Sequence, residues 1–162
     1  MTNAILDGVD DSRWALLDML AGMRRTLYLY TPWVRPALYD DPEVVDVIRS
    51  RVVNQPKLRL HLLLPPAGEW RSHCPHLMRL SERLTTALIL RTPNRREIPD
   101  VPELGQAFAI ADERELLHFS DPRRLIGSYQ PQPTERLKEL LELFQRIWSR
   151  SQPDPELSRL GL

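Results

Sequence analysis

The hydrophobic pattern of the first thirty residues predicts a helix followed by a strand. N-cap residue types at positions 10–12 precede apolar residues at helical spacing, which indicates a helix to about Met23. The β-prone residues at 26–31 then indicate a strand that Pro32 ends. The chain therefore begins with a helix and an early core strand.

The next sixty residues repeat this alternation. Positions 41–43 hold an N-cap aspartate, a first-turn proline and a first-turn glutamate, and these residues predict a helix with a buried face. Alternating apolar residues from Leu58 predict a strand that Pro65 ends. Pro75 opens another predicted helix, and a β-prone segment at 87–91 follows it. The pattern to this point is βαβαβ.

The last part of the chain changes character. Prolines and arginines at 92–103 predict a loop, and two short strands at 107–111 and 115–119 are expected to form a hairpin through a turn at 112–114. A final helix, with Pro133 in its first turn, is expected to bury an apolar stripe of leucines and aromatic residues that ends at Trp148. We therefore expect an α/β fold with a mixed, largely parallel sheet and helices on both faces.

The chain length of 162 residues fits one domain, which we place at residues 1–150. Residues 151–162 are expected to form an extended tail, in which Leu157, Leu160 and Leu162 are available to dock on a neighbour.

Charge gives no general attraction to nucleic acid or membranes, because 22 basic residues balance 22 acidic residues. The segment 51–98 differs, with nine basic and three acidic residues. The single cysteine excludes an internal disulfide. The sequence shows no signal-peptide pattern and no apolar run of about 18 residues, so we expect no membrane span and a cytoplasmic location.

The order of short βα units, hairpin and C-terminal helix resembles one half of a phospholipase D-type domain, over most of residues 27–151. In that superfamily a strand carries a motif of His, any residue, Lys, four residues and Asp, commonly followed by a Gly-Ser pair and an Asn. The resemblance implies that two such halves build one active site. One His attacks phosphorus, the other His protonates the leaving oxygen, and the lysines neutralise the phosphoryl oxygens.

This sequence departs from the motif at its chemical positions. Aligning Asp112 with the family's aspartate places Gly105 at the histidine and Ala107 at the lysine. Ser120 is the one match to the later Gly-Ser pair, and Gly127 begins another Gly-Ser pair about eight residues late. No His-x-Lys occurs anywhere in the chain, so no other register restores the motif. We therefore expect no hydrolysis by the family mechanism.

The resemblance implies three classes of function. The first is a non-catalytic binding or assembly module that forms a homodimer across the face bearing the motif. The second is an enzyme for phosphodiesters or nucleic acids with a relocated active site. The third is an accessory domain of an acetyltransferase, because similar bacterial domains sometimes follow a GNAT-like acetyltransferase. This chain lacks the glycine-rich pyrophosphate loop of such an enzyme, so the acetyltransferase would be a separate partner.

Basic residues supply the best candidate for a binding site. Arg91, Arg95 and Arg96, with Arg83 upstream, are expected near the carboxyl end of a strand, where open α/β sheets bind ligands. Guanidinium groups suit a phosphate-containing ligand. The alternative interpretation is that these arginines are solvated surface residues.

A second cluster contains reactive residue types. His73, Cys74 and His76 lie together before a helix, and His118 is the other histidine considered for a relocated site. A thiol near imidazoles at a helix N-terminus suits an activated nucleophile, whereas the alternative is an inert, partly buried thiol. A zinc site needs three or four ligands, and the sequence holds no second cysteine. We therefore expect neither a metal nor another cofactor.

Overall fold

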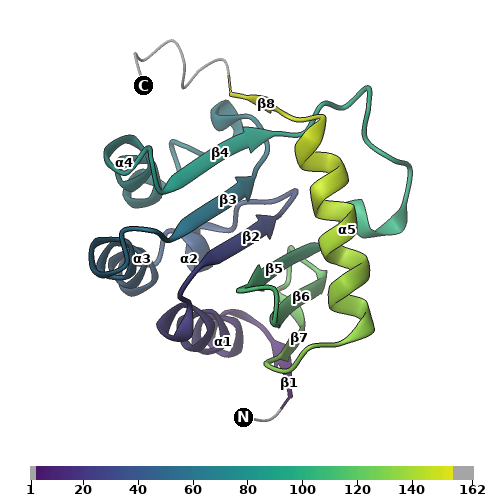
Figure 1. Cartoon of the computed structure of the whole chain (residues 1–162), viewed down its shortest axis with the longest axis horizontal. Helices are drawn as coiled ribbons and strands as arrows, with labels where there is room; N and C mark the ends of the chain where they lie inside the picture. The colour runs from purple at the N-terminus through teal and green to yellow at the C-terminus, as the bar shows by residue number, and fades with distance from the viewer. Residues whose placement is uncertain (1–2, 155–162) are drawn as a thin grey trace.

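The computed structural model describes residues 3–154. Their strands form one eight-stranded mixed sheet (Figure 1). Its strand order is β1-β7-β6-β5-β2-β3-β4-β8. Parallel pairing is confined to β2 (Thr26–Tyr30), β3 (Arg59–Leu63) and β4 (Leu88–Thr92). The antiparallel strands are β1 (Ala4–Asp7), β5 (Ala107–Ala111), β6 (Glu115–Asp121), β7 (Ile126–Gln130) and β8 (Gln152–Pro153).

The expected α/β class with a mixed sheet is confirmed, but antiparallel pairing predominates over the largely parallel pairing that we expected. The reason is physical: a short apolar run shows that a strand is buried, but it does not show the direction of the neighbouring strand.

Helices cover both faces of the sheet, as expected (Figure 1). One face packs against α1 (Val9–Gly22), α3 (Pro42–Asn54) and α4 (Pro75–Arg83), with the short α2 (Pro36–Tyr39) beside them. The other face packs against α5 (Glu135–Ser149). The sheet therefore separates a large apolar core from a smaller one that is rich in aromatic residues.

The capping residues explain where the helices begin. Asp41 accepts hydrogen bonds from the backbone N–H groups of Glu43 and Val44, both at 3.1 Å, so the predicted start of α3 is confirmed. Helix α1 begins earlier than expected, with Gly8 as its N-cap at a φ of 96°. The acidic residues at 10–11 lie in its first turn, where they complement the helix dipole.

Helix α5 carries the predicted apolar stripe. Leu137, Leu140, Phe144 and Ile147 are buried against the sheet. The N-cap is Thr134, which accepts a hydrogen bond at 3.1 Å from the backbone N–H of Leu137. Pro133, which we expected in the first turn of this helix, therefore lies just before its N-cap.

The segment after residue 150 extends the sheet. Pro153 pairs with Arg91, and Gln152 pairs with Thr92. The Asp154 carboxylate accepts a hydrogen bond at 2.5 Å from the backbone N–H of Ala67. The remaining expected tail, with Leu157, Leu160 and Leu162, lies outside the described residues. Within residues 3–154, no helix has the length and apolar character needed to cross a membrane.

Candidate functional site at the carboxyl edge of the sheet

The parallel strands β2, β3 and β4 end at one edge of the sheet, which we call the carboxyl edge (Figure 1). Strand β5 runs antiparallel to β2, with Phe108 opposite Tyr30, so the start of β5 reaches the same edge. Phe119 near the end of β6 pairs with Ala107. Open α/β sheets place ligands at this edge, because loops diverge there and leave space.

Three of the four motif positions gather at the carboxyl edge. Ala107 is the first residue of β5, Gly105 lies two residues before it, and Ser120 lies near the end of β6. Ala107 is fully buried. The Ser120 hydroxyl is exposed and donates to the Ile126 carbonyl at 3.3 Å. A hydrogen, a methyl group and a hydroxyl therefore occupy these places, and none of them is an ionisable group near neutral pH.

Asp112 lies at the opposite end of β5, in the turn to β6. Its carboxylate accepts hydrogen bonds from the backbone N–H groups of Arg24, Arg25 and Thr26 at 2.9, 2.7 and 3.1 Å. These contacts join the start of β2 to the β5–β6 turn, so Asp112 has a structural function here.

The four candidate arginines lie in three places. Arg83 lines a groove between α3 and α4, away from the carboxyl edge. Arg91 is held inside the fold: its Nε donates to the Ser151 hydroxyl at 2.7 Å, and its guanidinium lies 5.5 Å from the centre of the Trp148 ring. Arg95 and Arg96 lie in the loop after β4, at the carboxyl edge. Of the four candidate arginines, only Arg95 and Arg96 therefore lie together in one loop at the carboxyl edge.

Two adjacent hollows at this edge share Ile98. The first, of about 270 Å³, lies between the ends of β2, β3 and β4 and is lined by Trp33 and Arg95 among others. The second, of about 400 Å³, is lined by Arg96 together with Arg146 and Arg150 from the last turns of α5. We call these the edge hollows.

The charge in the edge hollows is mainly positive. Arg95 pairs with Glu69 at 3.6 Å, and 79% of its side chain is exposed. Within residues 3–154, Arg96, Arg146 and Arg150 form no ion pair with a carboxylate, and Glu97 is the one acidic residue that lines the second hollow. Sequence reasoning missed Arg146 and Arg150, because only the packing of α5 brings them beside the loop after β4.

Trp33 adds an aromatic surface to this edge. It lies three residues after the end of β2 and is 45% exposed. The guanidinium of Arg123, from the loop between β6 and β7, lies 4.0 Å from the ring centre. This cation–π contact joins two loops that are ninety residues apart and places another positive charge near the first hollow.

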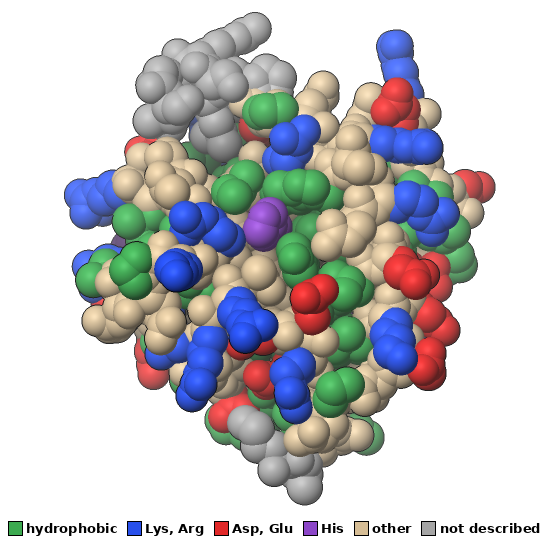
Figure 2. All heavy atoms as spheres, viewed as in Figure 1, with side chains coloured by type: hydrophobic (Ala, Val, Ile, Leu, Met, Phe, Trp, Pro, Cys, Tyr) green, Lys and Arg blue, Asp and Glu red, His purple; other side chains and the backbone are tan. Residues whose placement is uncertain are grey.

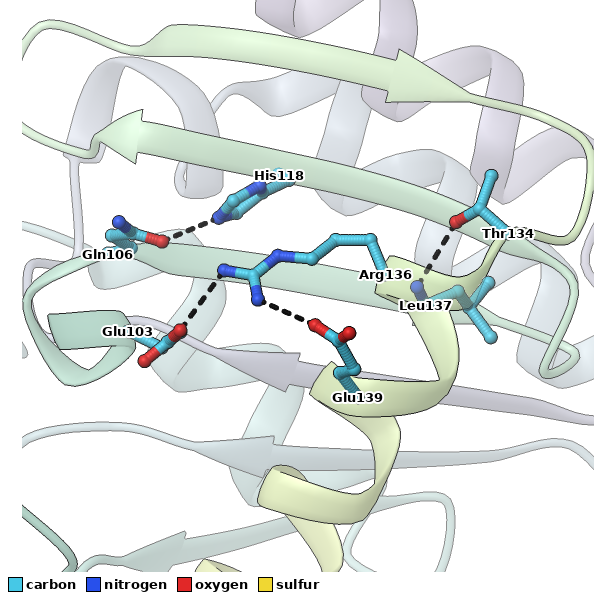
Figure 3. Close-up of polar contacts among 7 residues, drawn as sticks. All are labelled: Glu103, Gln106, His118, Thr134, Arg136, Leu137 and Glu139. Atoms are coloured by element: carbon cyan, nitrogen blue, oxygen red, sulfur yellow. Dashed lines mark hydrogen bonds and ion pairs between the residues drawn. The ribbon is translucent and has the colours of Figure 1, made fainter. Parts of the chain in front are cut away.

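His118 lies on β6 opposite Phe108, on the face covered by α5. Its Nε2 lies 2.7 Å from Oε1 of Gln106, and the two side chains point toward each other in Figure 3. Arg136 of α5 reaches Glu103 at 3.3 Å and Glu139 at 3.0 Å beside this pair. Burial lowers the pKa of His118, and Arg136 lowers it further, while Glu103 opposes the shift.

The neutral imidazole of His118 therefore donates its Nε2 proton to the amide oxygen of Gln106, which can only accept. Glu103 is held as a carboxylate, because its own backbone N–H and then Arg136 lower its pKa. The group contains a single imidazole, and the hydrogen bond to Gln106 occupies its Nε2.

The candidate reactive cluster does not come together. Cys74 is fully buried among apolar residues of the larger core, and burial, followed by the nearby Asp40, raises its pKa to about 11. His73 precedes α4 and His76 lies in its first turn, and both are exposed to solvent. His118 lies on the opposite face of the sheet. Because thiolate formation is suppressed, Cys74 is not an activated nucleophile.

Metal-ligating residues are also dispersed. In the part of the chain that the structure describes, no three His, Cys, Asp or Glu side chains group in a way that would hold a metal ion.

Solved structures with the same fold include three proteins of different kinds. TrmBL2, an archaeal chromatin protein described as showing a novel mode of DNA binding, matches with a TM-score of 0.64 and 14% identity over 94% of this chain and 54% of its own. NucT from Helicobacter pylori matches with a TM-score of 0.63 and 9% identity over 94% of this chain and 98% of its own.

Phosphatidylserine synthase from Haemophilus influenzae Rd KW20 matches with a TM-score of 0.55 and 13% identity, over 94% of this chain and 39% of its own. This chain thus spans about half of TrmBL2 and less than half of the synthase, but nearly all of NucT. At these identities the likeness concerns the fold, and it supports the phospholipase D-like fold expected from the sequence.

No functionally curated protein matches the chain significantly. A family model does match, and it covers residues 8–160, from the N-cap of α1 to beyond the last described strand. The chain therefore belongs to the family described as Domain of unknown function (DUF7931).

Proposed function

We propose that this chain is a non-catalytic phospholipase D-like module that binds a phosphate-containing ligand in the edge hollows. The observation that carries the proposal is the convergence of Arg95 and Arg96 with Arg146 and Arg150 around two adjoining hollows. Guanidinium groups present paired N–H donors that match phosphate oxygens. The names of two structural neighbours, which concern DNA binding and phospholipid synthesis, agree with a phosphodiester ligand.

The residues at the carboxyl edge are also the reason why we propose no catalytic turnover. Phospholipase D chemistry needs a nucleophilic imidazole and a cation at the positions of Gly105 and Ala107. A buried methyl group at 107 supplies neither a proton nor a charge. The ligand would therefore be bound and released unchanged.

The binding test compares two double variants that remove the same charge. Arg96→Ala/Arg146→Ala alters the edge, whereas Arg79→Ala/Arg83→Ala alters the exposed side of α4. Fluorescence anisotropy with a labelled fifteen-residue oligothymidylate should show at least tenfold weaker binding for the edge variant, since a tenfold change corresponds to about 1.4 kcal/mol, less than the roughly 1.5–3 kcal/mol of one hydrogen bond to a charged group. Equal weakening by both variants, or no binding by the unmodified protein, would contradict the proposal.

The same oligonucleotide tests the enzymatic alternative. The unmodified protein should leave it intact during prolonged incubation. Cleavage that disappears in His118→Gln would instead establish an enzyme with a relocated site near Gln106 and Arg136.

We also propose a homodimer across the carboxyl edge, supported by the exposed Trp33 that lines the first hollow. Sedimentation velocity at micromolar concentration should give a dimer that Trp33→Asp converts to a monomer. A monomeric unmodified protein would overturn the dimer and leave the binding test unaffected. An acetyltransferase as partner stays a proposal that an affinity pull-down tests.

A further inference from the structure

The sheet face that carries α5 is only partly covered by that helix. Figure 1 shows α5 crossing the face near the carboxyl ends of the strands, so that the first parts of β3 and β4 extend beyond the helix. In the space-filling view of the same side, Lys and Arg side chains gather around an area of apolar side chains and a histidine (Figure 2). Such a surface differs from the opposite face, where three helices cover the strands.

A row of flat or apolar side chains crosses β2, β3 and β4 in register. Tyr28 of β2 pairs with His61 of β3, which pairs with Ile89 of β4. The rings of Tyr28 and His61 lie 5.2 Å apart, and Trp148 of α5 contacts His61 edge-on at 5.0 Å. All four side chains are partly exposed. We call these four residues the stacking row.

Two arginines on the same face border the stacking row. Arg59 lies two residues before His61 on β3, and Arg91 lies two residues after Ile89 on β4. Because Arg91 pairs with Leu63, the two arginines are separated by four strand residues, or about 13 Å along the strand direction. The row therefore lies between two positive charges.

Neutral oxygen atoms hold both guanidinium groups. Arg59 donates to the carbonyls of Pro56 and Leu58, each at 2.9 Å, and Arg91 donates to Ser151 at 2.7 Å. Strands β2, β3 and β4 contain no acidic residue. Within residues 3–154, neither guanidinium forms an ion pair with a carboxylate, so these fixed positive charges suit an anionic partner.

We infer that the stacking row and its two arginines form a binding surface for single-stranded nucleic acid. Bases stack on exposed aromatic side chains of a sheet, while neighbouring arginines contact the phosphates, and this combination tolerates many sequences. An acidic peptide would satisfy the arginines but would leave the aromatic row without planar groups to contact. This surface is separate from the edge hollows and does not depend on them.

Three tryptophan indoles allow one experiment to separate the surfaces. Trp148 borders the stacking row, Trp33 lines the first edge hollow, and Trp14 is exposed on α1 at the opposite face. In ¹H–¹⁵N spectra of the unmodified protein, oligothymidylate of fifteen residues should shift the Trp148 indole signal and leave that of Trp14 in place. A shift of Trp33 alone would overturn this inference and still support ligand binding at the edge.

A charge-reversal pair provides the second test. Arg59→Glu should weaken oligothymidylate binding about tenfold or more, because loss of phosphate contact also disturbs stacking. The control Arg49→Glu makes the same charge change on α3, where Arg49 is exposed. Equal weakening by both variants would reduce the effect to general electrostatics and overturn the inference. The inference would also be overturned if inorganic pyrophosphate, which carries charge but no nucleobase, shifted the Trp148 indole signal as much as oligothymidylate does.

Discussion

The phenolic oxygen of Tyr129 lies 2.5 Å from Oε1 of Glu115 on the neighbouring strand. The same oxygen lies 2.9 Å from Oδ2 of Asp18 on α1. A phenol has one proton, so it donates to only one carboxylate at a time, and the second short contact needs a protonated carboxyl group. Burial is the largest cause that raises the pKa of Glu115; the hydrogen bond with Tyr129 opposes it, and the nearby Asp18 and Asp112 add to the rise.

The raised pKa of Glu115 makes stability depend on pH. Its contribution is fully present below 4.5, the ordinary value for glutamate, and is lost as pH rises through the folded-state pKa. Glu115→Gln should therefore be more stable than the unmodified protein at pH 7, and this difference should vanish near pH 4. Urea unfolding at both pH values measures it, with the exposed Glu113→Gln as a control that should change little. Equal stability of Glu115→Gln and the unmodified protein at pH 7 would contradict the pKa shift.

Asp112 should be a strong determinant of stability. Removing its carboxylate leaves three backbone N–H groups at the start of β2 without their acceptor. Asp112→Ala is expected to lower the free energy of unfolding by about 2–4 kcal/mol. In comparison, Asp121→Ala removes two longer contacts of 3.2 Å in an exposed loop and should cost less than about 1 kcal/mol. Equal effects in urea unfolding would show that the Asp112 contacts are not special.

Gly127 should tolerate no side chain. A Cβ atom there would lie 1.9 Å from the His118 carbonyl oxygen and 2.7 Å from the Cα of Phe119. Gly127→Ala must push β6 and β7 apart, and we expect a loss of about 3 kcal/mol. Gly105→Ala is the matched control, because a Cβ atom at 105 meets nothing within 4 Å, and it should change stability by less than about 0.5 kcal/mol. A Gly127→Ala variant as stable as Gly105→Ala would refute the close strand approach.

The lowered pKa of His118 gives the opposite pH dependence to that of Glu115. The stability it contributes is present above 6.5, the ordinary value for histidine, and is lost as pH falls through the folded-state pKa. His118→Gln should therefore lose less stability than the unmodified protein between pH 7.5 and 5. Part of the pH dependence of stability should remain in His118→Gln, because burial and then Arg59 also lower the pKa of His61. The exposed His73→Gln should follow the unmodified protein; identical curves for all three proteins would argue against the shift.

Sequence reasoning succeeded where the signal is local. The cap at Asp41 and the apolar stripe of α5 each lie within one helix, so neighbouring residues are enough to predict them. Strands β1, β7 and β8 were missed, because each depends on a distant partner. For example, β1 has four residues, and Ile5 in it is 88% exposed. Such a segment becomes a strand only by pairing with β7.

The candidate site was predicted only in part, for the same reason. The strand order brings the loop after β4 beside the end of α5, so Arg96 meets Arg146 although fifty residues separate them. The possible reactive cluster around Cys74 does not come together, because closeness in sequence does not fix the direction of a side chain. At the start of α4 the thiol turns into the core while His73 and His76 face solvent.

The three hydrogen bonds of Asp112 also affect how the motif positions 105, 107 and 112 can change during evolution. Replacing a residue that serves only a reaction affects turnover alone, whereas replacing Asp112 removes the hydrogen bonds that join the start of β2 to the β5–β6 turn. Selection for a folded protein would therefore preserve an aspartate at this position without any selection for hydrolysis. Among relatives, an invariant aspartate beside variable residues at 105 and 107 would mark lineages in which architecture has outlasted catalysis.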